Sequence, residues 1–201
     1  DGRFAVAVHR PKTIAELRDI VRSEAQSSGA IYPQGGRSAL DYGGVPALPG
    51  AAVDLTGLDQ VVDYPHADMT ITVQAGMTVE ALQHVLAEHR QRLLIDVPQA
   101  SRATLGGVFA TNTFGPRRFG LGRTRDQIIG VSFVNAEGVE IKGGGRVVKN
   151  VAGYDLPKLM TGALGSLGLL TRLTLKVRPI PEASAIVWMP LASIDQVDSA
   201  L

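Results

Sequence analysis

The amino-acid sequence predicts an α+β fold, and three observations favour it. Strand and helix periodicities alternate through the first hundred residues, the second half ends in strand patterns, and no repeat recurs at the period of a solenoid. The chain has 201 residues, of which 45% are hydrophobic and 19% charged, so it can bury a substantial core and is unlike a disordered segment.

Helices and strands are expected in turn along the first half of the chain. Thr13 and Glu16 have the spacing of a capping box, and apolar residues at helical spacing follow them toward Gly29. Thr78 is placed to cap a second helix, whose apolar stripe runs over 79–86. The strands expected in this half lie at residues 4–8, 31–32, 70–74 and 93–95.

The second half is expected to be richer in strands. Residues 128–134 and 139–141 flank Asn135-Ala-Glu-Gly138, which has the composition of a hairpin turn. Asp155 can cap a short helix, and apolar and polar residues alternate before Pro179. The elements expected here include that short helix at 156–160, strands at 173–177 and 186–189, and the start of a helix at 193–197.

Three separated glycine-rich segments, each beside an apolar run, suggest one long cofactor that is held at several points. In the first segment, Ile31–Ser38, the backbone of a Gly-Gly turn can form an anion-binding nest, and Arg37 adds positive charge. The second, 98–123, combines glycines with short hydrogen-bonding side chains, and the third, 162–168, directly precedes a strand. Taken alone, the first segment fits an ordinary turn as well as a phosphate site.

These segments supply the candidate cofactor-binding residues. Glycine lets a ligand approach the backbone closely, so a branched side chain at Gly36 or Gly107 is expected to obstruct the cofactor. The candidates are Pro33, Gly35, Gly36, Arg37, Ser38, Pro98, Thr104, Gly106, Gly107, Ala110, Thr111, Asn112, Gly115, Gly120, Gly168, Leu169 and Leu170.

Other classes of protein fit the sequence poorly. Gly35-Gly36 lacks the G-x-G-x-x-G spacing of a Rossmann site, and no Walker lysine follows it. The net charge of +1 argues against nucleic-acid and membrane-surface binding, and no apolar run approaches the length of a transmembrane helix. The four histidines are scattered, so no metal site is expected.

The lack of cysteine bears on both cofactor chemistry and compartment. Without cysteine this chain cannot bind an iron–sulfur cluster through thiolates, form a disulfide or link flavin through a thiol. No signal peptide is visible at the N-terminus. A reducing, cytoplasmic location is therefore expected.

The order of the glycine motifs resembles the FAD-binding (PCMH-type) domain of the vanillyl-alcohol oxidase/p-cresol methylhydroxylase flavoprotein superfamily. The resemblance covers about residues 3 to 180, and within the superfamily the chain is similar to flavin subunits of the glycolate oxidase family, especially over 149–160. The motifs that carry it are Pro-x-Gly-Gly-x-Ser at 33–38, Thr-x-Gly-Gly at 104–107, Arg118-Phe-Gly120, Val151-Ala-Gly-Tyr-Asp-Leu156 and Leu-Gly-Ser-Leu-Gly-Leu-Leu at 164–170.

The resemblance implies a domain organisation. It predicts a two-lobed FAD-binding domain over 1–182, with lobes of about 1–96 and 97–182 and the cofactor between them. Asp96-Val-Pro98 is a plausible local break for this boundary. Residues 183–201 would begin a C-terminal substrate or cap domain, most of which lies outside this chain.

The resemblance also implies a chemistry. FAD would be non-covalent, because Arg37 stands in the first glycine loop, where some superfamily members attach flavin through a histidine. The implied reaction is oxidation of a 2-hydroxy acid such as glycolate, with electrons passed to a homologous flavin subunit and an iron–sulfur subunit. A subunit that holds FAD or relays electrons without catalysis is the alternative, and a domain without its cofactor is a third possibility. No catalytic base is assigned.

Two further groups have more than one interpretation. Arg117, Arg118, Arg123 and Arg125 could lie near the flavin pyrophosphate, a substrate carboxylate or a partner subunit, or on a solvated loop with pairs to Asp126. By the same reasoning, the side chain of Tyr154 either faces the flavin ring or packs in the core.

Overall fold

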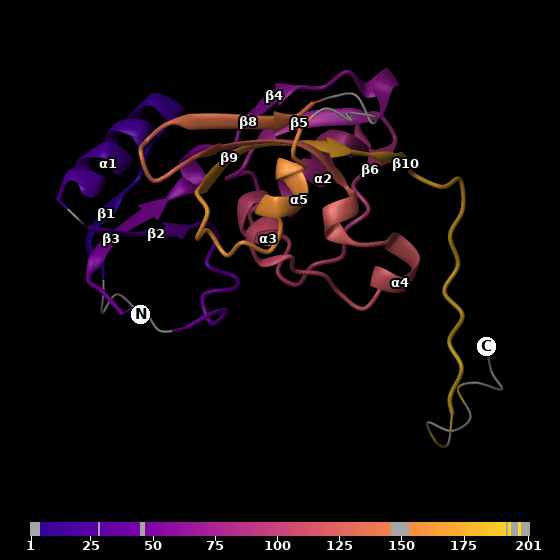
Figure 1. The fold of residues 1–201 in the computed structure, drawn as a ribbon. Helices are drawn as coiled ribbons and strands as arrows, with labels where there is room; N and C mark the ends of the chain where they lie inside the picture. Colours follow the sequence, from indigo (N-terminus) through magenta and orange to yellow (C-terminus); the bar gives the residue numbers. More distant parts are fainter. Residues whose placement is uncertain are drawn as a thin grey trace.

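The structure is a computed structural model that describes residues 5–27, 29–44, 47–145, 153–191, 193 and 197. A three-stranded and a five-stranded sheet, called here the smaller and the larger sheet, lie at opposite ends of one body, and β6 and β10 form a separate two-stranded sheet. The last described residues extend away from this body (Figure 1). The smaller sheet is parallel, with strand order β1-β3-β2 and one helix in the crossover. Its elements are β1 (Ala5–His9), α1 (Ile14–Gln26), β2 (Ala30–Gln34) and β3 (Gly50–Asp54).

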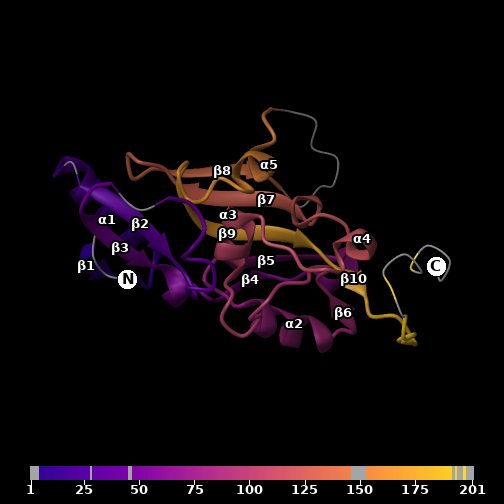
Figure 2. The ribbon, with the colours of Figure 1, turned by 90° about the horizontal axis from the view of Figure 1, so that it is seen from below.

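The larger sheet is antiparallel and has strand order β4-β5-β9-β7-β8. Helices α2 and α3 lie on one face of it, as Figure 2 shows from a second direction. Its strands are β4 (Val61–Asp63), β5 (Thr70–Gln74), β7 (Ile128–Val134), β8 (Glu140–Gly144) and β9 (Leu169–Lys176). The remaining elements are η1 (Leu55–Gly57), η2 (His66–Asp68), α2 (Val79–Ala87), β6 (Gln91–Arg92), α3 (Leu105–Thr111), α4 (Arg118–Leu121), η3 (Thr124–Asp126), α5 (Leu156–Met160) and β10 (Arg178–Pro179).

Two apolar clusters hold these layers together. The larger cluster fills the space between the five-stranded sheet and the helices, and includes the inaccessible side chains of Leu82, Phe109 and Leu173. The second cluster joins Leu17 of α1 to Val134 at the end of β7. Because this second cluster draws on both sheets, the two ends of the body are packed against each other rather than linked by a hinge.

The sheets divide the chain earlier than the expected lobe boundary near residue 96. The smaller sheet uses only residues 5–54, whereas β5 pairs with β9 and α2 packs on the larger sheet. Strand periodicity marks β5 as half-buried but carries no information about its partner, which lies about a hundred residues away in the sequence.

Most of the locally encoded elements are confirmed, together with the α+β fold class. Thr13, Thr78 and Asp155 each cap the helix expected after them, and the apolar stripe of α2 faces the core. The hairpin also forms, with the side chain of Asn135 accepting from the N–H of Val139 at 2.8 Å.

Two expected strands differ in the structure. Residues 93–95 follow β6 but do not form a strand. The side chain of Gln83 accepts from the N–H of Leu93 and donates to its carbonyl, so the main chain of Leu93 bonds this side chain instead of a neighbouring strand. Residues 186–189 are exposed and pair with no other described residue, so they form no strand. The helix start expected at 193–197 lies largely outside the described residues, as does the motif at 149–152.

Candidate functional site

A cleft of about 1130 Å³ brings the three glycine-rich segments together. Its walls are the loop that follows β2, one side of α3 and the loop between α5 and β9. The predicted residues that line it are Pro33, Gly35, Gly36, Arg37, Ser38, Thr104, Gly106, Gly107, Ala110, Thr111, Gly168 and Leu170.

The other five predicted residues lie outside the cleft lining. Pro98 is exposed, Gly120 stands in α4 with open space around it, and Gly115 packs on Asp96. Asn112 ends α3 in the left-handed conformation, and Leu169 is buried in the second apolar cluster. Glycine density therefore marked segments that border the cleft without separating cleft residues from turn and core residues.

The first wall is the loop that begins at the end of β2, and its shape depends on contact with the segment before α3. A Cβ on Gly35 would lie 2.1 Å from the hydroxyl oxygen of Thr104, and one on Gly36 would lie 1.5 Å from the carbonyl oxygen of Arg102. Gly36 is required because two stretches of main chain meet here, and Gly35 because the Thr104 side chain occupies the space of a Cβ. The next residue, Arg37, has a φ of 56°, which is unusual for a residue other than glycine.

The second wall is α3, whose first turn is hydrogen-bonded to Ala75, the residue that follows β5. The Thr104 side chain caps the helix by accepting from the N–H of Gly107, and the N–H of Gly106 donates to the carbonyl of Ala75 at 2.7 Å. A Cβ on Gly106 would lie 3.0 Å from Ala75, whereas one on Gly107 would meet, among the described residues, only the Thr104 hydroxyl, at 3.2 Å. Gly106 thus serves packing, while Gly107 leaves space on the cleft side.

The third wall is tied to α3 through main-chain bonds. The N–H of Gly162 donates to the carbonyl of Phe109 at 2.9 Å, and the N–H of Leu164 donates to that of Ala110 at 2.8 Å. Gly165, with a φ of 78°, approaches the Pro33 ring so closely that a Cβ would lie 2.5 Å from it. The first and third glycine segments are therefore neighbours across the cleft.

The cleft contains hydrogen-bonding groups without protein partners. Among the described residues, no acceptor is bonded to the N–H groups of Gly36, Arg37 or Ser38. The side-chain oxygen of Gln34 is buried and likewise accepts no hydrogen bond there. Unpaired N–H groups in a turn, beside an arginine, are suited to an anionic group such as a phosphate.

Part of the lining was missed by the sequence reasoning. The first loop continues along the cleft through Leu40, Asp41 and Tyr42 to a second glycine pair, Gly43-Gly44. That pair, eight residues after Gly35-Gly36, was the available signal. By contrast, Ala52 of β3 gave no signal, because a small apolar residue in a strand is ordinary.

None of the four arginines of the basic cluster lines the cleft. Arg117 forms an ion pair with Asp96 at 3.0 Å rather than with Asp126, and its hydrogen bonds hold the pKa of the Asp96 carboxyl below its usual range. The guanidinium of Arg118 lies 4.2 Å from the centre of the Phe114 ring. Tyr154 is 93% exposed and does not line the cleft, so its side chain does not pack in the core.

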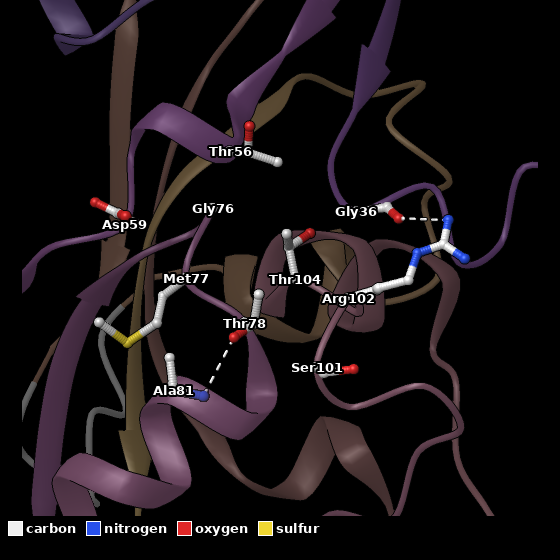
Figure 3. A pocket seen from close by; sticks show the side chains of 10 residues that line it. All are labelled: Gly36, Thr56, Asp59, Gly76, Met77, Thr78, Ala81, Ser101, Arg102 and Thr104. Atoms are coloured by element: carbon white, nitrogen blue, oxygen red, sulfur yellow. Dashed lines mark hydrogen bonds between the residues drawn. The ribbon is translucent and has the colours of Figure 1, made fainter.

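A smaller pocket of about 330 Å³ shares Gly36 and Thr104 with the cleft (Figure 3). Its other walls come from η1, the start of α2 and Ser101-Arg102. In Figure 3 the Arg102 side chain points out of this pocket toward Gly36, to which it is hydrogen-bonded.

Two other kinds of site were searched for in the described part of the chain. No group of three or more His, Cys, Asp or Glu side chains there could hold a metal ion. None of the helices in that part is both long and apolar enough to cross a bilayer.

The geometry is that of a domain with one long cleft, bordered by three glycine-rich segments and suited to an extended, anionic ligand. Comparison with known families names it: residues 5–144 match the model described as "FAD binding domain". The chain therefore belongs to the FAD-binding domain family, as its glycine motifs predicted, and FAD is the cofactor of this family.

Its relatives include proteins named for several 2-hydroxy acids. The chain is 32% identical over 190 residues to D-2-hydroxyglutarate dehydrogenase of Xanthomonas citri pv. viticola, covering 94% of this chain and 40% of the relative. It is 37% identical over 138 residues to glycolate oxidase subunit GlcE of Escherichia coli, covering 68% of this chain and 39% of that protein. Glycolate oxidase subunit GlcD of Bacillus subtilis is 32% identical over 196 residues, covering 96% of this chain and 41% of that protein.

The fold is also found in a solved structure of alkyldihydroxyacetonephosphate synthase. The TM-score is 0.75 at 23% sequence identity, over 88% of this chain and 32% of that chain. This likeness confirms the fold alone. The chain spans about two fifths of the length of the curated relatives described above.

Proposed function

We propose that FAD lies in the cleft, bound without a covalent bond, with its pyrophosphate at the loop of Gly36, Arg37 and Ser38. The observation that carries this proposal is the meeting of three distant glycine segments around one cleft of about 1130 Å³. The unpaired N–H groups of the loop suit phosphate oxygens, and the Gln34 oxygen can accept from a ligand donor. Non-covalent binding is supported by the absence of cysteine and by Arg37, which stands in the loop where some superfamily members have a flavin-linking histidine.

The protein to which this chain belongs then oxidises a 2-hydroxy acid such as glycolate. Bound FAD would supply the two-electron oxidant, while the chain's own residues hold the cofactor and limit its contact with water. The support is that relatives are named for D-2-hydroxyglutarate, glycolate and D-lactate. Catalytic residues stay unassigned: Asp41 carries the only carboxylate among the described residues that line the cleft, and it forms no ion pair with a described residue that would hold it as a base.

Partners and location form part of the same proposal. A homologous flavin subunit and an iron–sulfur subunit would receive the electrons, in the cytoplasm. The support is that two subunits of glycolate oxidase are among the relatives. Because this chain has no cysteine, a cluster with thiolate ligands would have to belong to another subunit or another part of the protein.

A subunit that holds FAD or relays electrons without oxidising substrate is the second candidate. One observation favours it: the chain is 37% identical to subunit GlcE and 32% identical to subunit GlcD, so its similarity does not single out one kind of flavin subunit. The two candidates differ in whether a hydroxy acid reduces the bound flavin directly.

One set of spectra on the full-length protein tests both candidates. We expect a flavin absorption spectrum, release of all flavin into the supernatant on acid precipitation, and bleaching of the flavin by glycolate without air. Flavin that precipitates with the protein would contradict the non-covalent claim. A bound flavin that dithionite bleaches but no 2-hydroxy acid reduces would favour the second candidate, and absence of flavin after reconstitution would contradict both.

A further inference from the structure

One side chain fastens the first glycine loop to the segment before α3. The Nη2 group of Arg102 donates to the carbonyl of Gly36 at 3.2 Å and to that of Arg37 at 3.5 Å. Its Nη1 group donates to the side-chain oxygen of Gln99 at 3.1 Å. The guanidinium therefore bridges residues that lie more than sixty positions apart, and Figure 3 shows its bond to Gly36.

The main chain of Arg102 also contacts the loop, at Gly36. The carbonyl oxygen of Arg102 occupies the place where a Cβ on Gly36 would stand. Main chain and side chain of Arg102 thus contact the loop at neighbouring points, which fixes its orientation as well as its distance. No acidic side chain among the described residues forms an ion pair with Arg102.

The loop that Arg102 holds has a conformation with an energetic cost. Arg37 has a φ of 56° and Gln99 a φ of 54°, and both residues accept hydrogen bonds from Arg102. The left-handed region is strained for a residue other than glycine, because the Cβ crowds the backbone there. Such a conformation persists only where its surroundings hold it, and the guanidinium contacts both strained positions.

We propose that Arg102 is a positioning residue for FAD: it latches the first glycine loop so that the N–H groups of Gly36, Arg37 and Ser38 are preorganised for the pyrophosphate. The inference rests on the proposed place of FAD in the cleft. Arg102 lines the smaller pocket and not the cleft itself, so it acts on the cofactor through the loop. Preorganisation raises affinity because the cost of ordering the loop does not fall on the binding step.

The test compares Arg102→Gln and Arg102→Lys with wild type in the full-length protein. We expect Arg102→Gln to weaken FAD binding by about tenfold, equal to about 1.4 kcal/mol. Lysine keeps the charge but lacks the guanidinium fork, so Arg102→Lys is expected to lose a smaller part. FAD affinity is measured by quenching of flavin fluorescence as flavin-free protein is titrated in. Arg118→Gln is the matched control, since it removes a positive charge outside the cleft and should keep wild-type affinity.

Amide hydrogen exchange of the flavin-free protein distinguishes an effect of Arg102 on the loop from a direct contact between Arg102 and FAD. In both Arg102 variants, we expect faster exchange in peptides covering 35–44 and unchanged exchange in β7 and β9. Weaker FAD binding with unchanged loop exchange would mean that Arg102 contacts FAD directly, which overturns the latch. Unchanged affinity, or faster exchange throughout the body, would also overturn it. If Arg102→Gln does not fold, Arg102→Lys carries the test, and failure of wild type to bind FAD contradicts the proposed function instead.

Discussion

Thr104 and Gly107 define a gap on the cleft side of α3. The Thr104 hydroxyl caps the helix by accepting from the Gly107 N–H, and it is the only non-neighbouring atom of the described residues that a Cβ on Gly107 would meet within 4 Å. Gly36 differs, because a Cβ there would collide with the carbonyl of Arg102. The two glycines expected to act alike toward the cofactor thus stand in different surroundings.

Gly107→Ala is expected to weaken FAD binding by at least about tenfold, because the new methyl group extends into the cleft where we place the cofactor. The stability of the flavin-free protein should be kept or raised, since alanine favours a helix over glycine by about 1 kcal/mol. Flavin titration and thermal unfolding measure the two quantities.

Gly120→Ala is the matched control, because Gly120 also stands in a short helix but is surrounded by open space and lies outside the cleft. Equal flavin affinity of Gly107→Ala and wild type would place the cofactor elsewhere. Gly36→Val is expected to lower thermal stability together with flavin binding, because its side chain cannot fit without moving the backbone of Arg102.

The ion pair of Asp96 and Arg117 predicts that the stability of the fold depends on pH in the acid range. The side-chain and backbone hydrogen bonds from Arg117 lower the Asp96 pKa in the folded state. The resulting stabilisation is complete above the unfolded-state pKa of about 3.9 and is lost as the pH falls through the lower folded-state value. Arg117→Gln should therefore show a smaller fall in Tm between about pH 5 and about pH 2.5 than wild type.

Arg123→Gln is the control for this acid effect, since Arg123 forms no ion pair with a described residue. Its Tm should follow the wild-type curve against pH. Parallel curves for Arg117→Gln and wild type would show that the pair does not contribute to acid stability.

The cap of α1 predicts a separate, local effect on stability. Thr13 accepts from the N–H of Glu16 at 3.1 Å, and the Glu16 carboxylate accepts from the N–H of Lys12 at 2.8 Å. Thr13→Ala should lower the free energy of unfolding by about 1 kcal/mol. Thr13→Ser keeps the capping hydroxyl and should leave the free energy of unfolding close to the wild-type value. Denaturant unfolding measures this, and a loss as large for serine as for alanine would assign the effect to packing of the methyl group instead.

The 201-residue chain by itself is expected to bind FAD without oxidising glycolate or lactate. The chain spans about two fifths of the length of its relatives, and hydride transfer needs a substrate held against the flavin and a positioned base. Reduction of an artificial electron acceptor should therefore stay at background. Rapid bleaching of its flavin by glycolate, without air and without another subunit, would show that the catalytic groups lie within these residues.

Local signals in the sequence predicted local structure well. The caps at Thr13 and Thr78 and the hairpin turn at Asn135 form as expected, because each depends on residues within four positions of one another. Strand β3 was not predicted, since its residues are buried on both faces and show no alternation. Helix α3 was also missed, because its two glycines disfavour a helix in isolation.

The sequence by itself determined the α+β class and the three glycine-rich segments that border the cleft, because the turns in those segments depend on glycines that are visible in the chain. Its resemblance to a flavoprotein family indicated FAD. Both Gly36 and Gly107 border the cleft, and only the tertiary structure decided that Gly107 leaves space there whereas Gly36 is needed for packing against the distant backbone of Arg102. The tertiary structure also determined that β5 pairs with β9 and that Arg117 forms its ion pair with Asp96. The physical reason is that a glycine or a charge is encoded at one position, whereas its neighbour in space is set by the packing of the whole chain.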